Sequence, residues 1–559
     1  MASGRSAKQA QRTLGSLLEH LLPGSSRDPS CLRWPPDAFG IASYLLKLSG
    51  SYIDVLHQWP PRGRLRRHPS GVQWVDWVRE VGQRWRNVST QTSTPLPPEV
   101  SDLWKRVLKE ERTQIDVIAK KRELSSCLLQ LVAMADEASA GAGITQPGPK
   151  DSFSQQSSLL LAGVGSNGHC TLGRALSPAQ IRILPKQHSP RGGLTLRSLT
   201  HHLALHVGGE VTPFWYTIPQ APTTKHSMNL LIAPWPLKLR PSQFGPAPGT
   251  LENMPPGFGF AEFKPDDDPT SVANWLADLM DAAALISGTI DGVVFPEASL
   301  SQGEYLRVKK LVLARGAFLI AGVLRDAPTP GTPCSNLLMF DATHHGVPMT
   351  ITQSKHHRWR LDRGQIEMYG LGGKLDPTKE WWEHIALGPR EVHFVSLNEQ
   401  LSLCCLVCED LARQDPVAEL VRSVGPNLVV ALLMDAPQLG ARWPARYATV
   451  LADDPGSSVL TVTSAGMVDL TRTPRNGKPS RSIGLWKDAR SDFTELELPP
   501  GAAGLVLSLC TERMEEWTAD GRSNRGFTGY CRLGGVHAVS VVSRVTRRKS
   551  RRKPKLSKP

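Results

Sequence analysis

Between residues 226 and 535, short apolar runs alternate with longer segments whose apolar residues recur at helical spacing. The runs 229–234, 291–296 and 317–324 have the length and composition of buried strands. The segments 270–287 and 303–315 have the period of amphipathic helices. Further strands are expected at 335–341, 347–355, 427–434 and 458–463, and a further helix near 417–424. This alternation predicts a layered α/β domain.

The apolar run 401–407 ends at Cys408 and changes at once to Glu409 and Asp410. That pattern is typical of a buried strand followed by a sharp turn. It would leave Cys408 at the carboxyl end of the strand, where open α/β sheets bind ligands. A thiol with a pKa of about 8.5 is only a few per cent thiolate at neutral pH. Cys408 is therefore a candidate nucleophile only if the chain also supplies a base and a cation.

The N-terminal part of the chain, 1–138, is expected to be a mainly helical accessory domain. Leucines recur at helical spacing over 14–22, and a long helix is expected within 98–138. Its charged stretch 105–122 would be an exposed helical face or part of a helical hairpin. The segment 139–158, rich in small residues, predicts a linker.

A tryptophan stripe lies on one of these expected helices. Trp74, Trp77 and Trp85 share a face, and Arg84 and Arg86 flank the last ring. Cations beside aromatic rings are suited to stacking with nucleic acid. Core packing is the favoured interpretation, because tryptophans at helical spacing usually face the core.

Residues 159–225 are expected to form a small connecting region that contains strands. Glycines at 163, 165 and 168 match a dinucleotide-binding pattern, which requires a following helix and an acid about 20 residues later. Neither is present, since the chain has no Asp or Glu from 152 to 209. A glycine-rich hairpin is the better prediction. His201 and His202 are interpreted as structural, because no further ligand stands at metal-binding spacing.

The formal net charge of +14 is unevenly distributed. Residues 544–559 carry nine Lys or Arg and no acid, which leaves +5 on the rest of the chain. We expect 540–559 to be a disordered basic tail. It would either attract nucleic acid or an acidic partner, or serve only solubility.

Nine cysteines without regular spacing argue against a disulfide framework and for a reducing compartment. The N-terminus lacks the apolar core of a signal peptide, and no apolar run reaches about 18 residues. We therefore expect a cytoplasmic protein that does not enter a membrane. Cys405 and Cys408 form a C-x-x-C, but residues three apart on a strand point to opposite faces. Neither a zinc site nor redox chemistry is predicted, and no metal or cofactor is expected.

Three polar residues each end an apolar strand: Glu297, Lys355 and Cys408. Each has an ordinary explanation when taken alone. Glu297 could be a solvated turn acid, and a buried cysteine behaves as a small hydrophobe. That second explanation is retained for Cys404 and Cys405. Lys355 would continue the apolar face of its strand, so it needs a partner or a chemical role.

Together these residues resemble the nitrilase (carbon–nitrogen hydrolase) superfamily, whose catalytic set is Glu, Lys and Cys in that chain order. The segments 294–298 (VFPEA), 354–357 (SKHH) and 407–411 (VCEDL) resemble its glutamate, lysine and nucleophile motifs. The segment 367–372 (EMYGLG) resembles the part that bears a second glutamate. Segments 443–447 and 461–466 resemble the helix and strand after the nucleophile. The resemblance covers roughly 226–535 and implies an α-β-β-α sandwich.

Two departures from the family pattern concern the substrate more than the chemistry. The interval between Lys355 and Cys408 is longer than in a compact member. It contains 381–384 (WWEH), which we interpret as an inserted or lengthened helix beside the pocket. Residues 1–225 have no counterpart in a minimal member.

The resemblance implies acyl transfer at an amide-like or nitrile carbon. Cys408 would attack and form a thioester, and Glu297 would take the thiol proton and later activate water. Lys355 would stabilise the developing oxyanion, and Glu367 would orient Lys355 or the substrate nitrogen. The remaining positions expected at the pocket are Glu409, through its backbone N–H, and Trp443.

The predicted function is hydrolysis of a non-peptide carbon–nitrogen bond in a small amide, carbamoyl compound or nitrile, by a protein that is expected to be a homo-oligomer. Amidase activity is favoured over nitrilase activity. The alternative is a nitrilase-like component of a multi-part assembly, for example in bacterial defence. Residues 1–225 and the basic tail would then bind a partner or nucleic acid.

Overall fold

The protein is described here by a computed structural model. The structure describes residues 12–541, apart from 23–27, 57–72, 144–150, 164–169, 219–226, 249–254, 328, 330–331, 473–478 and 527. The predicted glycine-rich hairpin at 163–168 and the basic tail at 540–559 lie almost wholly outside the described residues.

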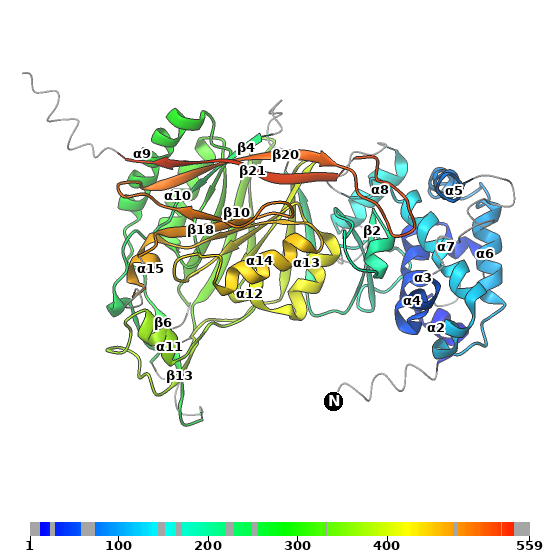
Figure 1. Ribbon diagram of the computed structural model, residues 1–559, viewed down its shortest axis with the longest axis horizontal. Helices are drawn as coiled ribbons and strands as arrows, with labels where there is room; N and C mark the ends of the chain where they lie inside the picture. Colours follow the sequence, from blue (N-terminus) through cyan, green and yellow to red (C-terminus); the bar gives the residue numbers. More distant parts are fainter. Residues whose placement is uncertain are drawn as a thin grey trace, which may run out of the picture.

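Two β-sheets packed face to face form the centre of the larger part of the molecule (Figure 1). The first follows the order β11-β10-β9-β7-β4-β20-β21, with β8 beside β9, and the second the order β19-β18-β17-β16-β15-β14-β3. Buried side chains from both sheets belong to one apolar cluster, so the inner faces pack together. The first sheet consists of β4 (Ser227–Ile232), β7 (Gly292–Val294), β8 (Leu300–Ser301), β9 (Phe318–Arg325), β10 (Ser335–His344), β11 (Val347–Ser354), β20 (Gly504–Met514) and β21 (Thr528–Val539). The second consists of β3 (Thr212–Thr217), β14 (Glu391–Asn398), β15 (Leu401–Val407), β16 (Leu428–Leu432), β17 (Ser458–Val462), β18 (Ser482–Lys487) and β19 (Thr494–Glu497).

Helices cover the outer face of each sheet. On the first sheet, α9 (Pro269–Ser287) and α10 (Gln302–Ala314) pack through a second apolar cluster. On the second sheet lie α13 (Glu419–Val424) and α14 (Trp443–Asp453), with the short α12 (Glu409–Ala412) beside them (Figure 1). These four layers are those of the predicted α-β-β-α sandwich. The short α15 (Ala465–Leu470) follows β17.

Strands β16 and β17, which are covered on both faces, show why these strands could be predicted from the sequence. All residues of β16 and β17 are buried. A strand with both faces covered reads as a continuous apolar run rather than an alternating one. The two helices on the first sheet also have clear starts. Asp268 caps α9, and Ser301 forms a capping box with Glu304 at α10.

A smaller four-stranded sheet lies at one end of the sandwich, around α11 (Arg363–Met368) (Figure 1). Its order is β12-β13-β6-β5. These strands are β5 (Phe244–Pro246), which follows the short turn η5 (Pro241–Gln243), β6 (Phe258–Phe263), β12 (Arg360–Leu361) and β13 (Glu380–Glu383). The segment 381–384, interpreted from sequence as a helix, is therefore strand β13, which pairs in parallel with β6. That pairing joins residues more than a hundred positions apart, which local pattern does not reveal.

The N-terminal part is helical and lies beside one end of the sandwich (Figure 1). The expected long helix within 98–138 is divided into α6 (Pro98–Leu108), the turn η3 (Ile115–Lys120) and α7 (Arg122–Ala138). Its charged stretch belongs to the turn of a helical hairpin, one of the two arrangements expected. The other helical elements are α2 (Leu14–Leu21), η1 (Pro29–Leu32), α3 (Pro35–Ser49), α4 (Ser51–Leu56), α5 (Trp74–Val88) and α8 (Ser152–Leu161).

The tryptophan stripe lies on α5 and packs in the core. Trp85 is fully buried, and its Nε1 donates to Leu32 O at 3.1 Å. Arg86 is buried as well and pairs with Asp151 Oδ2 at 2.6 Å. Arg84 pairs with Glu99 at 2.6 Å. Both arginines are therefore engaged in ion pairs, and Trp85 and Arg86 are buried, which favours the packing interpretation over nucleic-acid stacking.

The connecting region does not stand apart from the sandwich. It contains the two-stranded sheet of β1 (Ile181–Pro185) and β2 (Leu203–Val207), with the turn η4 (Leu196–Leu199) between them. Strand β3 then pairs in parallel with β14 and so forms one edge of the second sheet of the sandwich. The expected linker at 139–158 contains the start of α8. The predicted boundaries at 158 and 225 therefore do not separate independent layers.

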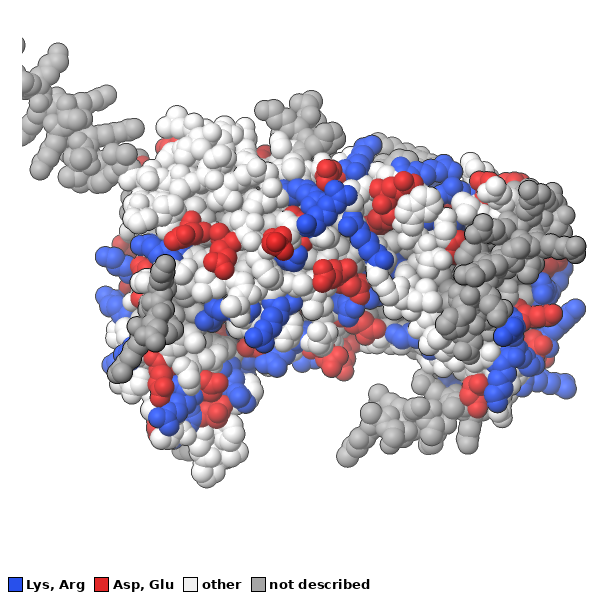
Figure 2. Space-filling model, viewed as in Figure 1, with Lys and Arg blue, Asp and Glu red and all other residues white. Residues whose placement is uncertain are grey.

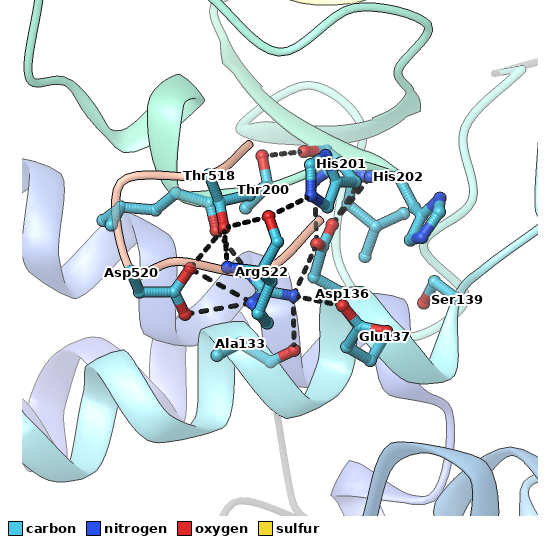
Figure 3. Close-up of polar contacts among 12 residues, drawn as sticks. Ala133, Asp136, Glu137, Ser139, Thr200, His201, His202, Thr518, Asp520 and Arg522 are labelled. Atoms are coloured by element: carbon cyan, nitrogen blue, oxygen red, sulfur yellow. Dashed lines mark hydrogen bonds and ion pairs between the residues drawn. The ribbon is translucent and has the colours of Figure 1, made fainter. Parts of the chain in front are cut away.

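A buried arginine joins the helical part to the sandwich. The segment between β20 and β21 carries Arg522, which is fully buried against α7 (Figure 3). Its guanidinium pairs with Asp136 at 3.1 Å, Glu137 at 2.9 Å and Asp520 at 2.9 Å. His201 donates a hydrogen bond from Nε2 to Arg522 O at 2.9 Å. The structural role predicted for His201 fits this position.

Charges of both signs are interspersed on the face shown in Figure 2. Ion pairs such as Arg532–Glu512 and Arg490–Glu512 lie along β20 and β21. Within the described ranges, no helix is long and apolar enough to cross a membrane.

Candidate active site

Two sheets contribute the three predicted reactive residues. Glu297 follows β7 and Lys355 follows β11 in the first sheet, whereas Cys408 follows β15 in the second. All three are buried, with exposed fractions of 3%, 1% and 4% respectively. The site therefore lies at the strand ends, where the sequence placed it.

Close backbone packing fixes the position of Glu297. Gly322 of β9 lies directly against it, and a Cβ at that position would stand 2.3 Å from Pro296 O and 2.5 Å from Glu297 Cα. Gly322 N donates to Pro296 O at 3.1 Å. Only glycine permits this approach of two backbones.

Lys355 is held between two carboxylates. Its Nζ lies 2.7 Å from Glu297 Oε1 and 2.5 Å from Glu383 Oε2. Asn336, buried at the start of β10, donates from Nδ2 to Glu297 Oε1 at 2.9 Å and to Glu383 Oε1 at 3.0 Å. The backbone N–H of Trp359 also donates to Glu383 Oε2, at 3.0 Å. The lysine and the two carboxylates thus form one fixed unit.

The charges within this unit shift the pKa of each member. Burial alone would lower the pKa of Lys355, but Glu297 and Glu383 outweigh burial and hold it well above its ordinary value. Burial raises the pKa of Glu297, and Glu383 raises it further, while Lys355 opposes both. Lys355 is therefore cationic, and Glu297 accepts a proton more readily than an ordinary carboxylate.

One oxygen of this unit is left open. Glu297 Oε2 is buried and has no hydrogen-bond partner among the described residues. Buried carboxylate oxygens in proteins are normally satisfied. An open oxygen on a fixed carboxylate is the arrangement that a general base requires.

Cys408 has a strained backbone, with φ 46° and ψ −106°. Such a conformation in a residue other than glycine costs about 1–3 kcal/mol and persists only where the surroundings enforce it. The Cys408 N–H donates to Leu432 O at 2.9 Å, which anchors the turn to β16. The strain turns the chain sharply from β15 into α12, as the sequence pattern predicted.

The thiol of Cys408 is protonated at rest. Burial raises its pKa well above the ordinary value, and Glu297 raises it further. Lys355 lowers the pKa, as expected from sequence, but does not outweigh the other effects. The main reason is burial, which disfavours the charged thiolate, and the Glu297 carboxylate adds to it. The nucleophile must therefore be generated by proton transfer rather than held as a thiolate.

Glu367, expected to orient Lys355, lies elsewhere. It is on α11, its side chain is 61% exposed, and it pairs with Arg363 at 2.9 Å. The carboxylate that contacts Lys355 is Glu383, from β13. The sequence offered one signal for Glu383: it is the acid within 381–384, the segment already noted as an insertion between Lys355 and Cys408.

The other predicted pocket positions differ in their surroundings. Glu409 begins α12, and its side chain pairs with Arg413 at 2.7 Å, so only its backbone N–H could act at the site. Trp443 begins α14, where its ring lies edge-to-face against Tyr447. Arg442, the residue before Trp443, pairs at 2.9 Å with Asp435, which lies just beyond the end of β16.

Asp410 ties the nucleophile turn to the lysine strand. It accepts the backbone N–H of His356 at 3.1 Å and contacts His357 Nδ1 at 3.0 Å. It therefore belongs to the turn network expected for it.

Cys404 and Cys405 are buried in β15, in keeping with a packing role. Across the described parts of the chain, no group of three His, Cys, Asp or Glu is arranged to hold a metal ion.

Comparison with known proteins gives likeness of structure only. No protein-family model and no curated protein sequence matches the chain. Among solved structures, an amidase from Nesterenkonia sp. is similar at 14% identity and a TM-score of 0.31, over 51% of this chain and 90% of that chain. A cysteine-to-alanine mutant of the Nesterenkonia AN1 amidase from the nitrilase superfamily is similar at 15% identity and a TM-score of 0.32, over 51% and 92%. The same type of mutant in complex with butyramide matches at 14% identity and a TM-score of 0.31, again over 51% and 92%. Likeness at this level does not establish activity or substrate, so both are inferred from the site.

Proposed function

We propose that the protein hydrolyses a non-peptide carbon–nitrogen bond, in an amide, carbamoyl compound or nitrile, through a thioester on Cys408. The observation that carries this proposal is the open Oε2 of Glu297 beside a buried, carboxylate-bound Lys355. A structural ion pair has no need for an unsatisfied oxygen. Of the possible substrates, a small amide is favoured.

Acylation begins with proton transfer. Glu297 takes the thiol proton of Cys408 as sulfur attacks the carbonyl carbon. The negative charge that develops on oxygen is stabilised by Lys355 and the backbone N–H of Glu409, each such donor being worth about 2.7–4 kcal/mol. Glu297 then gives its proton to the leaving nitrogen, and the carbon–nitrogen bond breaks. Glu297 then takes a proton from a water molecule, whose oxygen attacks the thioester carbon. The carbon–sulfur bond breaks, Glu297 returns the proton to the sulfur of Cys408, and the carboxylic acid leaves.

The charge of the resting site supports this sequence. Lys355 faces two carboxylates, so the unit with Glu297 and Glu383 carries an excess negative charge when both are ionised. Protonation of Glu297 neutralises that excess at the moment when negative charge forms on sulfur and then on oxygen. Asn336 and Glu383 hold the lysine in place, and act as positioning residues. This arrangement favours the hydrolase over a purely structural role in an assembly.

The test is intact-protein mass spectrometry after incubation with a series of small primary amides. The wild-type protein is expected to gain the mass of an acyl group and release ammonia. Cys408→Ala should gain nothing, whereas Cys404→Ala, altered in the same strand, should behave as wild type. The proposal fails if no amide, carbamoyl compound or nitrile acylates the wild-type protein, or if Cys408→Ala is acylated equally.

A further inference from the structure

A second polar position lies at the same sheet edge as Cys408. Strands β15 and β16 run in parallel, with Val407 opposite Leu432, so their carboxyl ends lie side by side. Asp435 stands three residues beyond the end of β16. Cys408 directly follows β15, so Cys408 and Asp435 both lie beyond the carboxyl ends of two neighbouring strands.

Two side chains hold the Asp435 carboxylate, and a third holds its backbone. Its Oδ1 accepts from Tyr369 OH at 2.7 Å and from Arg442 Nη2 at 2.9 Å. Its backbone N–H donates to Thr463 Oγ1 at 3.2 Å, and Thr463 Oγ1 donates to Asp435 O at 2.6 Å. The side chain is therefore fixed by the residue after α11 and the residue before α14, and the backbone by the residue after β17.

The second oxygen of the carboxylate is open. Asp435 Oδ2 is buried, on a side chain only 8% exposed, and has no partner among the described residues. Arg442 Nε, on the residue that binds Oδ1, is also buried without a partner there. An acceptor and a donor on two paired side chains are thus left open in a position where protein groups are normally satisfied.

One buried apolar cluster extends from the catalytic base to this position. Ala298, next to Glu297, belongs to it together with Trp359, Tyr369, Met434 and Ala436. The last two residues flank Asp435, and Tyr369 donates to it. The surroundings shared by Glu297 and Asp435 are therefore largely apolar.

We propose that Asp435 is a specificity-determining residue that binds a second, unreactive carboxamide of the substrate. Its Oδ2 would accept the carboxamide N–H, and Arg442 Nε would donate to the carboxamide oxygen. The Asp435–Arg442 pair is already neutral, so a neutral group fits better than an ammonium ion, whose charge would be uncompensated in a buried position. The preferred substrates are therefore linear diamides. This inference rests on the proposed hydrolysis at Cys408.

The test compares linear diamides of increasing length, malonamide to adipamide, with isosteres in which the far CONH₂ is replaced by COCH₃. A third set carries an ammonium group at that end. The wild-type protein is expected to prefer one diamide over its ketone isostere by about tenfold to a hundredfold in kcat/KM, the effect of one buried hydrogen bond left unmade. The preference should appear mainly in KM, because the group lies away from the reacting carbon.

Asp435→Asn is the decisive variant. The amide oxygen can still accept from Tyr369 and Arg442, while an NH₂ group replaces the open oxygen. The variant should lose the preference for the diamide and retain its rate on the ketone isostere within a few-fold. The control is Asp453→Asn, on the exposed end of α14, which should keep the preference. Thermal unfolding checks that both variants are folded.

The outcomes separate the two proposals. Equal rates on diamide and isostere in the wild-type protein, or equal loss on both in Asp435→Asn, would overturn the specificity role while leaving hydrolysis at Cys408 intact. Preference for the ammonium substrates would overturn the carboxamide assignment. Absence of acylation by every simple amide and diamide would overturn both the hydrolase and the inference built on it.

Discussion

Among the described residues, Arg522 and Lys355 are two buried cations that are each surrounded by carboxylates, and their hydrogen bonding differs. Every guanidinium nitrogen of Arg522 donates: Nε to Asp520, Nη1 to Asp136 and Glu137, and Nη2 to Leu199 O (Figure 3). The cluster joins α7 to the segment after β20. Its hydrogen bonding is complete, as expected of a structural joint.

In the cluster around Lys355, by contrast, some buried polar atoms have no hydrogen-bond partner. Glu297 Oε2 and Asn336 Oδ1 are buried without a partner among the described residues, and the neighbouring Cys408 has a strained backbone. Both features are unfavourable for folding. The difference suggests how a buried ion cluster can be classified from structure. The Arg522 cluster satisfies its buried polar groups, whereas the Lys355 cluster leaves two polar atoms open for a substrate or a proton.

Replacement of the base should have the largest effect and separates the two clusters most clearly. Glu297→Gln keeps the size and the contact with Asn336 but cannot accept a proton. The rate of acylation is expected to fall by about 10²–10⁴-fold. The free energy of unfolding should not fall, because one of two adjacent buried carboxylates is neutralised. Stopped-flow acylation and urea unfolding measure the two effects, and an active Glu297→Gln would contradict the assignment of the base.

Replacement of the structural cation should have the opposite profile. Arg522→Met leaves three carboxylates without their partner, and removal of one member of a buried ion pair destabilises proteins by about 3–5 kcal/mol. Acylation by the fraction that remains folded should be unchanged. The matched control is Arg490→Met, whose ion pair with Glu512 is about half exposed and should matter by less than about 1 kcal/mol. Equal unfolding free energies for the two variants would show that the Arg522 joint is not structural.

The two clusters should also respond differently to acid. The pKa of Glu297 is raised above its ordinary 4.5 by burial, so its ionised form, and with it activity, is lost as the pH falls through a value above 4.5. Burial opposes ionisation of Asp136, but Arg522 and the neighbouring histidines outweigh it and hold its pKa below the ordinary 3.8. Its contribution to stability is therefore present above pH 3.8 and is lost as the pH falls through that lower pKa.

A folded but inactive state is expected near pH 4.5. Activity measured against pH and circular dichroism over the same range should show two separate transitions, and activity should return on neutralisation. Coincident loss of activity and fold would contradict the separation of the two clusters.

The smallest effect concerns the two candidate second glutamates. Glu367→Gln changes an exposed residue and should alter stability by less than about 0.5 kcal/mol and leave activity unchanged. Glu383→Gln should lower activity, because Lys355 loses one of its two charged partners. A larger effect of Glu367→Gln than of Glu383→Gln on acylation would restore the expectation drawn from the sequence.

The sequence predictions were accurate where the signal is local along the chain, and they failed where it depends on contacts between distant segments. Strands β15, β16 and β17 were predictable because burial on both faces makes them continuous apolar runs. Glu297 and Cys408 were predictable for the same reason, since each is the polar residue at which such a run ends. Lys355 was predictable because it continues the apolar face of the half-buried strand β11. These signals are local and need no knowledge of the partners.

The site residues that the sequence did not reveal take their roles from contacts between segments that are far apart in the chain. Glu383 reaches Lys355 only because β13 pairs with β6, far away in the chain. Asn336 is a polar residue at the start of an apolar strand, and its bridging role becomes visible only when Glu297 and Glu383 are placed. Glu367 was chosen by its distance along the chain from Lys355, which does not fix its direction once α11 turns its side chain outward.

The position of β3 has a practical consequence for dissecting the protein. A fragment that begins at residue 226, where the sandwich was predicted to start, would lack this strand and expose the backbone edge of β14. Unpaired strand edges recruit other chains, so such a fragment is expected to associate or precipitate whatever its catalytic competence. A fragment intended to carry the chemistry alone should therefore begin before Thr212, and should also replace the apolar surface that α7 covers.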